Sequence, residues 1–147
     1  LYLPSMHPIF KVPDALDDEL VVALNCALGT VYRGLEVAGA QRGQTIVTQG
    51  AGGLGLYTVA LAKDLGAGCI IAIDGLEPRL ALAKELGADE TININELRTP
   101  EERIARVKEI TGGQGADVVV ELVGLGELLP EGVDMLAFGG TFVEIGM

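Results

Sequence analysis

The sequence has few of the residues from which several common kinds of site are built. Its 147 residues include two cysteines, one histidine and no tryptophan, and aromatic side chains make up only 4%. Cys26 and Cys69 form no C-x-x-C pair, which argues against a disulfide framework and against a complete structural zinc site. The shortage of aromatics likewise argues against an aromatic binding platform.

Basic side chains are also scarce. Ten Lys and Arg residues against 21 Asp and Glu residues give a formal net charge of −11, so the average surface repels nucleic acid and anionic lipid. No run reaches the roughly 18 apolar residues of a membrane-spanning helix, and the opening LYLPSMHPIF lacks the features of a secretory signal. We expect a cytoplasmic protein with no nucleic-acid or membrane partner, in which a polyanionic ligand needs a locally positive site.

Glycine, by contrast, is abundant, with 21 residues. In four segments a glycine follows an apolar-periodic stretch and precedes a β-favouring run, as expected where a helix ends and a strand begins. These segments are DLGAGCIIAID, ELGADETINI, GGQGADVVVELVG and FGGTFVEIG. Alternating strands and helices predict a parallel sheet with helices on both faces. We therefore expect an α/β doubly wound (Rossmann) fold of about five strands in the order 3-2-1-4-5, without the last crossover and sixth strand.

The pattern predicts one dinucleotide-binding domain over residues 1–147. It comprises an entry segment at 1–13, one or two helices within 14–39 and the Rossmann core at 45–146. Within the core, strands are expected at 45–49, 69–74, 90–94, 117–122 and 141–145, and helices at 54–65, 77–86, 100–110 and 131–138. Thr99, Pro100 and Glu102 have the spacing of a capping box that opens the third of these helices.

The densest glycine cluster lies between the first strand and its helix. The segment Gly50-Ala51-Gly52-Gly53-Leu54-Gly55 matches G-x-G-x-x-G, and Asp74 ends the next strand 19 positions after Gly55. In this pattern the first glycine permits a tight turn, the second lets the backbone approach a pyrophosphate, and the last lets helix and strand pack closely. Amides at the helix start, around Gly53 and Leu54, supply the positive potential that the acidic chain otherwise lacks.

Asp74 points to the kind of dinucleotide. A carboxylate at this position accepts hydrogen bonds from the ribose hydroxyls and repels a 2′-phosphate, so the pattern favours NAD over NADP. Arg79, in the following helix, would soften that preference or lie in solvent. A purely structural interpretation also stays open, in which the glycines form a tight turn that binds no ligand and Asp74 is a helix N-cap.

The segment NCALGTVYRGLEVAGAQRGQTIVTQGAGGLGLYTVALAKDLGAGCIIAIDG resembles the cofactor domain of zinc-type medium-chain alcohol dehydrogenases, and the likeness extends from FKVPDAL to GGTFVEIGM. The resemblance rests on the joint spacing of a Cys-x3-Thr-x-Tyr helix, the glycine motif and the acid. It implies an NAD(P)-dependent oxidoreductase that moves hydride between the nicotinamide and a small-molecule alcohol or carbonyl. It also nominates site residues: Cys26 as a catalytic zinc ligand, Thr30 as a catalytic residue near the nicotinamide, and, in looser matches, Val123, Ile145, Gly146 and Met147 as the lining of the cofactor cleft.

The sequence departs from this family in what it lacks. We expect the chain to lack the N-terminal catalytic domain that would supply the other zinc ligands, and the only histidine, His7, has the pattern of a surface residue. We expect an inactive fragment that binds no zinc, taken from a zinc-dependent parent. We also expect a homo-oligomer, formed either through the open edge of the last strand or through the face that the missing domain would cover. Two rival hypotheses are a zinc-independent quinone or enoyl reductase of the same superfamily, against which Cys26 and Asp74 count, and a non-catalytic dinucleotide-binding or oligomerisation module.

Overall fold

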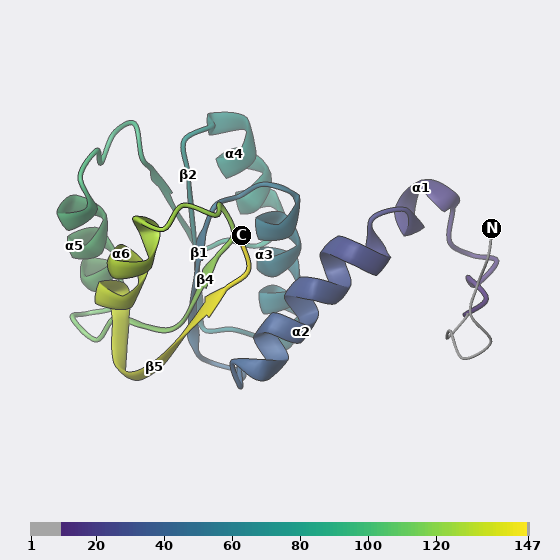
Figure 1. Ribbon diagram of the computed structural model, residues 1–147, viewed down its shortest axis with the longest axis horizontal. Coiled ribbons are helices and arrows are strands. Elements are labelled where there is room, and N and C mark those ends of the chain that lie inside the picture. Colours follow the sequence, from purple (N-terminus) through teal and green to yellow (C-terminus); the bar gives the residue numbers. More distant parts are fainter. Residues whose placement is uncertain (1–9, 147) are drawn as a thin grey trace.

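Five parallel strands form one sheet between two layers of helices. Figure 1 shows the computed structural model, which describes residues 10–146. The strand order is β3-β2-β1-β4-β5, and every neighbouring pair is parallel. The predicted doubly wound fold and strand order are therefore confirmed. The strands are β1 (Thr45–Gln49), β2 (Cys69–Asp74), β3 (Glu90–Asn93), β4 (Ala116–Glu121) and β5 (Leu136–Glu144).

The core has two halves because helices cover both faces of the sheet. Successive strand residues alternate between them: Ile46 packs with α2, α3 and α4 on one face, and Val47 packs with α5 and α6 on the other. Burial on both faces explains why β1, β2 and β4 have continuous apolar runs. No helix within residues 10–146 is both long and apolar enough to cross a membrane. The helices of the core are α3 (Gly53–Leu65), α4 (Glu77–Leu86), α5 (Pro100–Ile110) and α6 (Leu128–Met135).

The N-terminal helical pattern divides into three pieces. They are α1 (Asp18–Val21), the π-helix η1 (Leu24–Leu28) and α2 (Gly29–Val37). Val31 and Leu35 of α2 are buried against the core, whereas η1 buries no side chain. Both η1 and α2 contact α3, while α1 lies farther from the sheet (Figure 1). The sequence periodicity predicts helix here but does not distinguish an α-helix from the wider π-turn.

The boundary between the last helix and the last strand differs from the prediction. The sequence predicts a helix at 131–138, but α6 ends at Met135 and β5 begins at Leu136, which has extended backbone and pairs with Ala116. Pairing resumes with Thr141 opposite Val118, so the intervening residues, including Gly139 at φ 81°, form an irregular bulge. The glycine pair expected to end a helix therefore lies inside the strand.

The sheet brings the carboxyl ends of its central strands together. Gln49, the last residue of β1, pairs with Ile73 of β2 on one side and with Glu121 of β4 on the other. The crossovers from β1 and from β4 run in opposite directions, which makes this the point where doubly wound sheets place a crevice for ligands.

The capping box of α5 allows a direct test of the local interpretation. The amide of Glu102 donates to Thr99 Oγ1 at 3.3 Å, and the amide of Thr99 donates to Glu102 Oε2 at 2.9 Å. We expect Thr99→Ala to lower the free energy of unfolding in urea by about 1 kcal/mol because one helix-start amide loses its acceptor. Glu102→Gln is the control, since glutamine keeps an acceptor oxygen. An unchanged unfolding midpoint for Thr99→Ala would contradict the capping role.

Candidate functional site

The turn between β1 and α3 is closed so tightly that two of its positions exclude a side chain. Gly50 has φ 103°, and a Cβ built on it would lie 2.9 Å from Val123 Cγ2. A Cβ on Gly55 would overlap the carbonyl oxygen of Gly50. Gly53, in contrast, has no heavy atom within 4 Å of such a Cβ. The glycine pattern therefore reflects the close approach of helix and strand, as the sequence predicts.

The first turn of α3 leaves backbone donors free at the end of the sheet. Gly52 is the N-cap and has no side chain to bond the helix start. The amides of Gly53, Leu54 and Gly55 have no acceptor within the helix, because an intrahelical acceptor would have to lie four residues earlier. Together with the helix dipole they form a positive pole suited to a phosphate.

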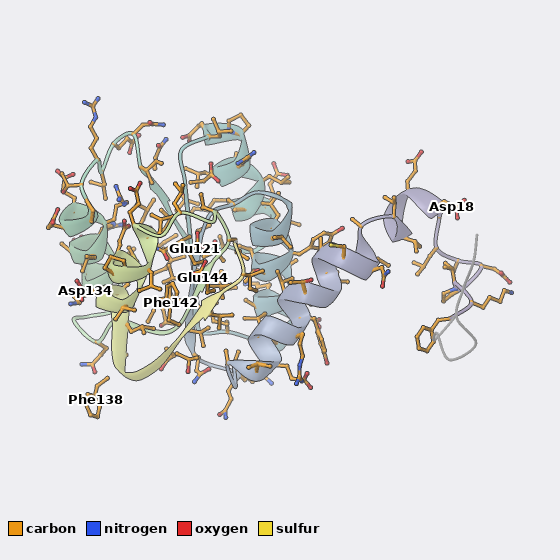
Figure 2. The ribbon with its side chains drawn as sticks, viewed as in Figure 1. Asp18, Glu121, Asp134, Phe138, Phe142 and Glu144 are labelled. Atoms are coloured by element: carbon orange, nitrogen blue, oxygen red, sulfur yellow. The ribbon has the colours of Figure 1, made fainter. Side chains whose placement is uncertain are left out.

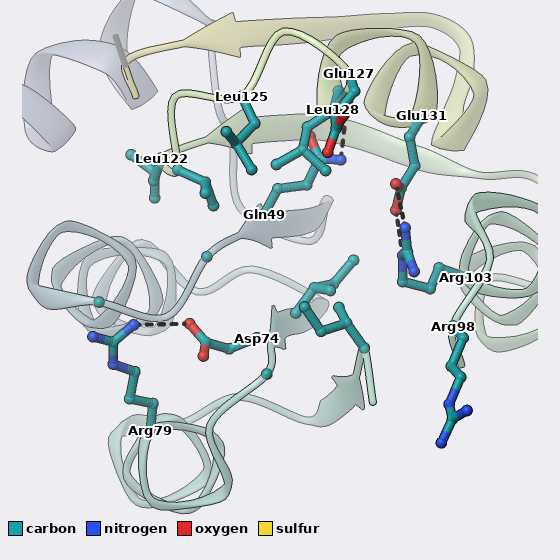
Figure 3. Close-up of a pocket in the computed structure, with 16 residues that line it drawn as sticks. Gln49, Asp74, Arg79, Arg98, Arg103, Leu122, Leu125, Glu127, Leu128 and Glu131 are labelled. Atoms are coloured by element: carbon teal, nitrogen blue, oxygen red, sulfur yellow. Dashed lines mark hydrogen bonds and ion pairs between the residues drawn. The ribbon is translucent and has the colours of Figure 1, made fainter. Parts of the chain in front are cut away.

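A cavity of about 560 Å³ opens beside this turn. That volume lies within the range of roughly 300–1,000 Å³ typical of small-molecule sites. Figure 3 shows Asp74 and Arg79 on one side of the cavity and Leu122 and Leu125 on the other, with Arg103 and Glu131 at one end. Of the predicted cofactor residues, the cavity is lined by Gly50, Gly52, Asp74, Arg79 and Val123.

Asp74 joins the glycine turn to the start of α4. Its Oδ2 accepts the amide of Ala51 at 2.8 Å, and its Oδ1 accepts the amide of Leu76 at 2.9 Å. The side chain is almost buried, so these charge-assisted bonds fix its position. Oδ1 keeps a second lone pair that can accept a ligand hydroxyl, whereas Oδ2 also faces Arg79 Nη1. Asp74 therefore connects the glycine turn to the start of α4 and also offers a hydrogen-bond acceptor at the cavity wall.

Arg79 lies next to Asp74 but is only loosely paired with it. Its Nη1 is 3.5 Å from Asp74 Oδ2, and the side chain is 49% exposed. A pair of this length and exposure contributes little to stability. The same Nη1 is 4.0 Å from the point where a Cβ on Gly52 would lie, so Arg79 also faces the glycine turn.

Glu121 holds the cavity wall after β4 against the end of β5. Its carboxylate is fully buried and accepts the amides of Val123 at 2.7 Å and Gly124 at 2.9 Å. Its backbone carbonyl accepts the amides of Ile145 and Gly146. The segments after β4 and β5 that the sequence nominates are thus brought together, although Ile145 and Gly146 do not line the cavity. Met147 lies outside the described residues.

Glu144 lies beside Glu121 on the neighbouring strand (Figure 2). Hydrogen bonding to Glu121, then slight desolvation and the charge of Glu121, raise the pKa of the exposed Glu144 carboxyl above its ordinary value. Two adjacent carboxyl groups are most compatible when one of them carries a proton. This proximity accounts for the direction of the shift at Glu144.

Thr30 and Cys26 lie away from the cavity. Both are exposed, Thr30 in the first turn of α2 and Cys26 within η1. Thr30 is four residues before Gly34, where a Cβ would meet Ile145 Cδ1 at 2.8 Å, so Thr30 is on the helix face that turns toward the end of β5. Within residues 10–146 no group of three His, Cys, Asp or Glu side chains is arranged to hold a metal ion. The described residues therefore do not fit a zinc centre.

Comparison with known proteins identifies the family. A family model described as zinc-binding dehydrogenase matches residues 53–147. The chain belongs to the zinc-binding dehydrogenase family. It is 42% identical over 146 residues to 5-exo-hydroxycamphor dehydrogenase of Pseudomonas putida, a match that covers 99% of this chain and 40% of that protein. The chain thus spans about two fifths of the length of the curated dehydrogenases that it matches.

Solved structures of dehydrogenases share the fold. The alcohol dehydrogenase TADH from Thermus sp. ATN1 superposes with a TM-score of 0.87 at 33% identity, over 94% of this chain and 39% of that one. The mycobacterial protein Rv1454c, solved in complex with NADPH, superposes with a TM-score of 0.83 at 31% identity, over 92% of this chain and 41% of that one.

Sequence reasoning missed several residues that line the cavity of this dehydrogenase domain. Gln49 directly precedes the glycine motif, and its position at a strand end was a usable signal. Arg103 and Glu131 form a buried ion pair at one end of the cavity. Each stands four residues before a buried apolar residue, Val107 and Met135 respectively. Opposite charges on the apolar faces of two helices are a signal for such a pair.

The tight turn predicts opposite outcomes for two glycines of α3. Gly55→Ala should lower the free energy of unfolding by about 1–3 kcal/mol or more, because the new methyl group overlaps the Gly50 carbonyl. Gly53→Ala, two positions earlier, should leave stability unchanged or raise it by about 0.5 kcal/mol. Urea unfolding followed by circular dichroism measures both. Equal stability of the two variants would show that α3 does not approach β1 this closely.

The Glu121–Glu144 pair predicts a dependence of stability on pH. Because the folded-state pKa of Glu144 is raised, its contribution to stability is fully present below the ordinary unfolded pKa of 4.5 and is lost as pH rises through the folded value. Glu144→Gln removes this titration, so the variant should gain stability relative to the unaltered chain as the pH rises above the ordinary value of 4.5. Urea midpoints measured across that range test the idea, with Glu127→Gln as the control at an exposed carboxylate. A constant difference between Glu144→Gln and the unaltered chain would refute it.

Proposed function

We propose that this chain is the cofactor-binding domain of a zinc-type alcohol dehydrogenase and that its ligand is NAD(H). The observation that carries the proposal is the glycine turn, where Gly50 and Gly55 exclude side chains and Gly52, the N-cap of α3, lines a cavity walled by Asp74. The domain would extend over residues 1–147, with the Rossmann core at 45–146. Membership of the zinc-binding dehydrogenase family supports this assignment.

In this proposal the glycine turn and its surroundings hold the dinucleotide. The amides from Gly52 to Leu54 would bind the pyrophosphate, because the helix start is positive in an otherwise acidic chain. Asp74 would accept the hydroxyls of the adenosine ribose through its remaining lone pairs. The apolar walls of the cavity would enclose the adenine ring, and the residues that form them are Ile73, Ile94, Leu122 and Leu125.

The proposed activity belongs to the whole protein. The nicotinamide, when bound, exchanges hydride with an alcohol or carbonyl substrate. This domain contributes the position of the cofactor, with Thr30 and Ile145 proposed to lie nearest the nicotinamide. Cys26 is proposed as one zinc ligand of the parent enzyme. Because the described residues form no metal centre, no step of the reaction is assigned to zinc in this chain.

The preference for NAD follows from the fixed charge of Asp74. We expect the unaltered chain to bind NADH at least about tenfold more tightly than NADPH, a difference of ~1.4 kcal/mol. Asp74→Ala should weaken NADH binding by a similar factor because hydrogen bonds to the ribose are lost. Fluorescence titration with both cofactors measures these affinities, on protein shown by circular dichroism to be folded.

Asp64→Ala is the matched control, because it removes the same charge from an exposed position on α3. The NADPH affinity of Asp74→Ala separates two effects of the substitution. Loss of the hydrogen bonds to the Ala51 and Leu76 amides alone would weaken the binding of NADH and NADPH equally. Loss of ribose recognition would weaken the binding of NADH only. Equal affinity of the unaltered chain for the two cofactors would defeat the NAD assignment.

A further inference from the structure

Arg103 and Glu131 form a buried, bidentate ion pair between α5 and α6. Arg103 Nε donates to Glu131 Oε1 and Arg103 Nη2 donates to Glu131 Oε2, each at 2.7 Å. The two side chains are only 9% and 2% exposed. The Glu131 carboxylate raises the pKa of the guanidinium, so the pair stays charged. Burying two charges is costly and often stabilises a protein no more than apolar residues of similar size would, so the pair calls for another explanation.

A third hydrogen bond connects this pair to the cavity wall. Arg103 Nη1 donates to the carbonyl oxygen of Leu97 at 2.9 Å. Leu97 belongs to the connection between β3 and α5, from which Ile94 and Arg98 line the cavity. Each of the three guanidinium nitrogens of Arg103 thus donates one hydrogen bond, either to α6 or to this connection.

The opposite wall of the cavity is tied to the sheet through α6. Gln49 Nε2, at the end of β1, donates to the carbonyl oxygen of Leu128 in the first turn of α6 at 3.1 Å. The residues directly before α6 include Leu122 and Leu125, which line the cavity opposite Asp74 (Figure 3). Glu131 lies one turn after Leu128 on the same helix. The ion pair therefore connects the two walls between which the proposed adenine slot lies.

We propose that Arg103 and Glu131 are positioning residues for the nucleobase: they set the distance between the Ile94–Arg98 connection and α6, and with it the width of the slot. This inference rests on the proposed function. Without the pair, the connection loses the hydrogen bond between Arg103 and the Leu97 carbonyl. The side chains of the connection then have to become ordered when the base binds. That ordering lowers affinity without any contact between the pair and the ligand.

Stability and positioning can be separated by comparing single and double substitutions. Arg103→Met or Glu131→Leu alone leaves one buried charge without its partner and should lower the urea midpoint. Arg103→Met combined with Glu131→Leu removes both charges and should restore the midpoint. Arg106→Met is the matched control, since Arg106 lies one turn later on α5 and forms partly exposed ion pairs with Glu109 and Glu90.

The decisive readout is affinity for NADH and for AMP, measured on the folded double variant by fluorescence and by calorimetry. We expect the double variant to recover stability but to bind both ligands about tenfold more weakly, the cost of ordering a freed segment. Arg106→Met should match the unaltered chain. If the double variant does not fold, Arg103→Lys replaces it in the experiment. Lysine keeps the positive charge but cannot form the bidentate hydrogen bonds of the guanidinium, so this variant should also bind AMP more weakly.

The possible results are distinct. A folded double variant, or a folded Arg103→Lys variant, that binds AMP as tightly as the unaltered chain would show that the pair is only structural and would overturn the inference, while the proposed function stands. Failure of the unaltered chain to bind NADH would overturn the proposed function and this inference with it.

Discussion

The absence of a methyl group at residue 55 is the constraint on which the nucleotide end of the molecule depends. Because the Gly50 carbonyl occupies the space a Cβ would need, α3 begins directly against the end of β1. This contact places Gly52, the N-cap of α3, at the cavity, directly before the free amides of the helix start. It also brings Ala51 within hydrogen-bond distance of Asp74, which in turn fixes the start of α4 through Leu76.

The acidic composition serves the fold as well as the surface. Carboxylates repeatedly accept backbone amides where strands begin or end: Asp117 accepts Thr45 and Asp89 accepts Ile70, at 2.7 and 2.8 Å. Glu121 does the same for the turn after β4. Such bonds satisfy donors that the sheet leaves free and are stronger than neutral ones. A net charge of −11 therefore coexists with a positive pole at the start of α3.

Local signals predicted the fold, and long-range contacts account for what they missed. Strand and helix periods, glycine ends and the capping box at Thr99 are properties of neighbouring residues, so the order of elements and the glycine turn could be predicted. The Arg103–Glu131 pair joins positions 28 apart, and no local pattern specifies that contact. The bulge around Gly139 looked like a helix end because both use a glycine with positive φ. The exposed settings of Cys26 and Thr30 likewise depend on how η1 and α2 pack, which their spacing does not encode.

The make-up of α6 has a consequence for the cavity wall. The helix has eight residues, fewer than an isolated helix needs to persist in water, and contains Gly132, which costs about 1 kcal/mol relative to alanine. Alanine could not replace this glycine, since its Cβ would overlap Phe142. The helix therefore owes its order to tertiary contacts, among them the close packing of Gly132 against Phe142. The cavity wall that α6 forms thus keeps its shape only while those contacts are made.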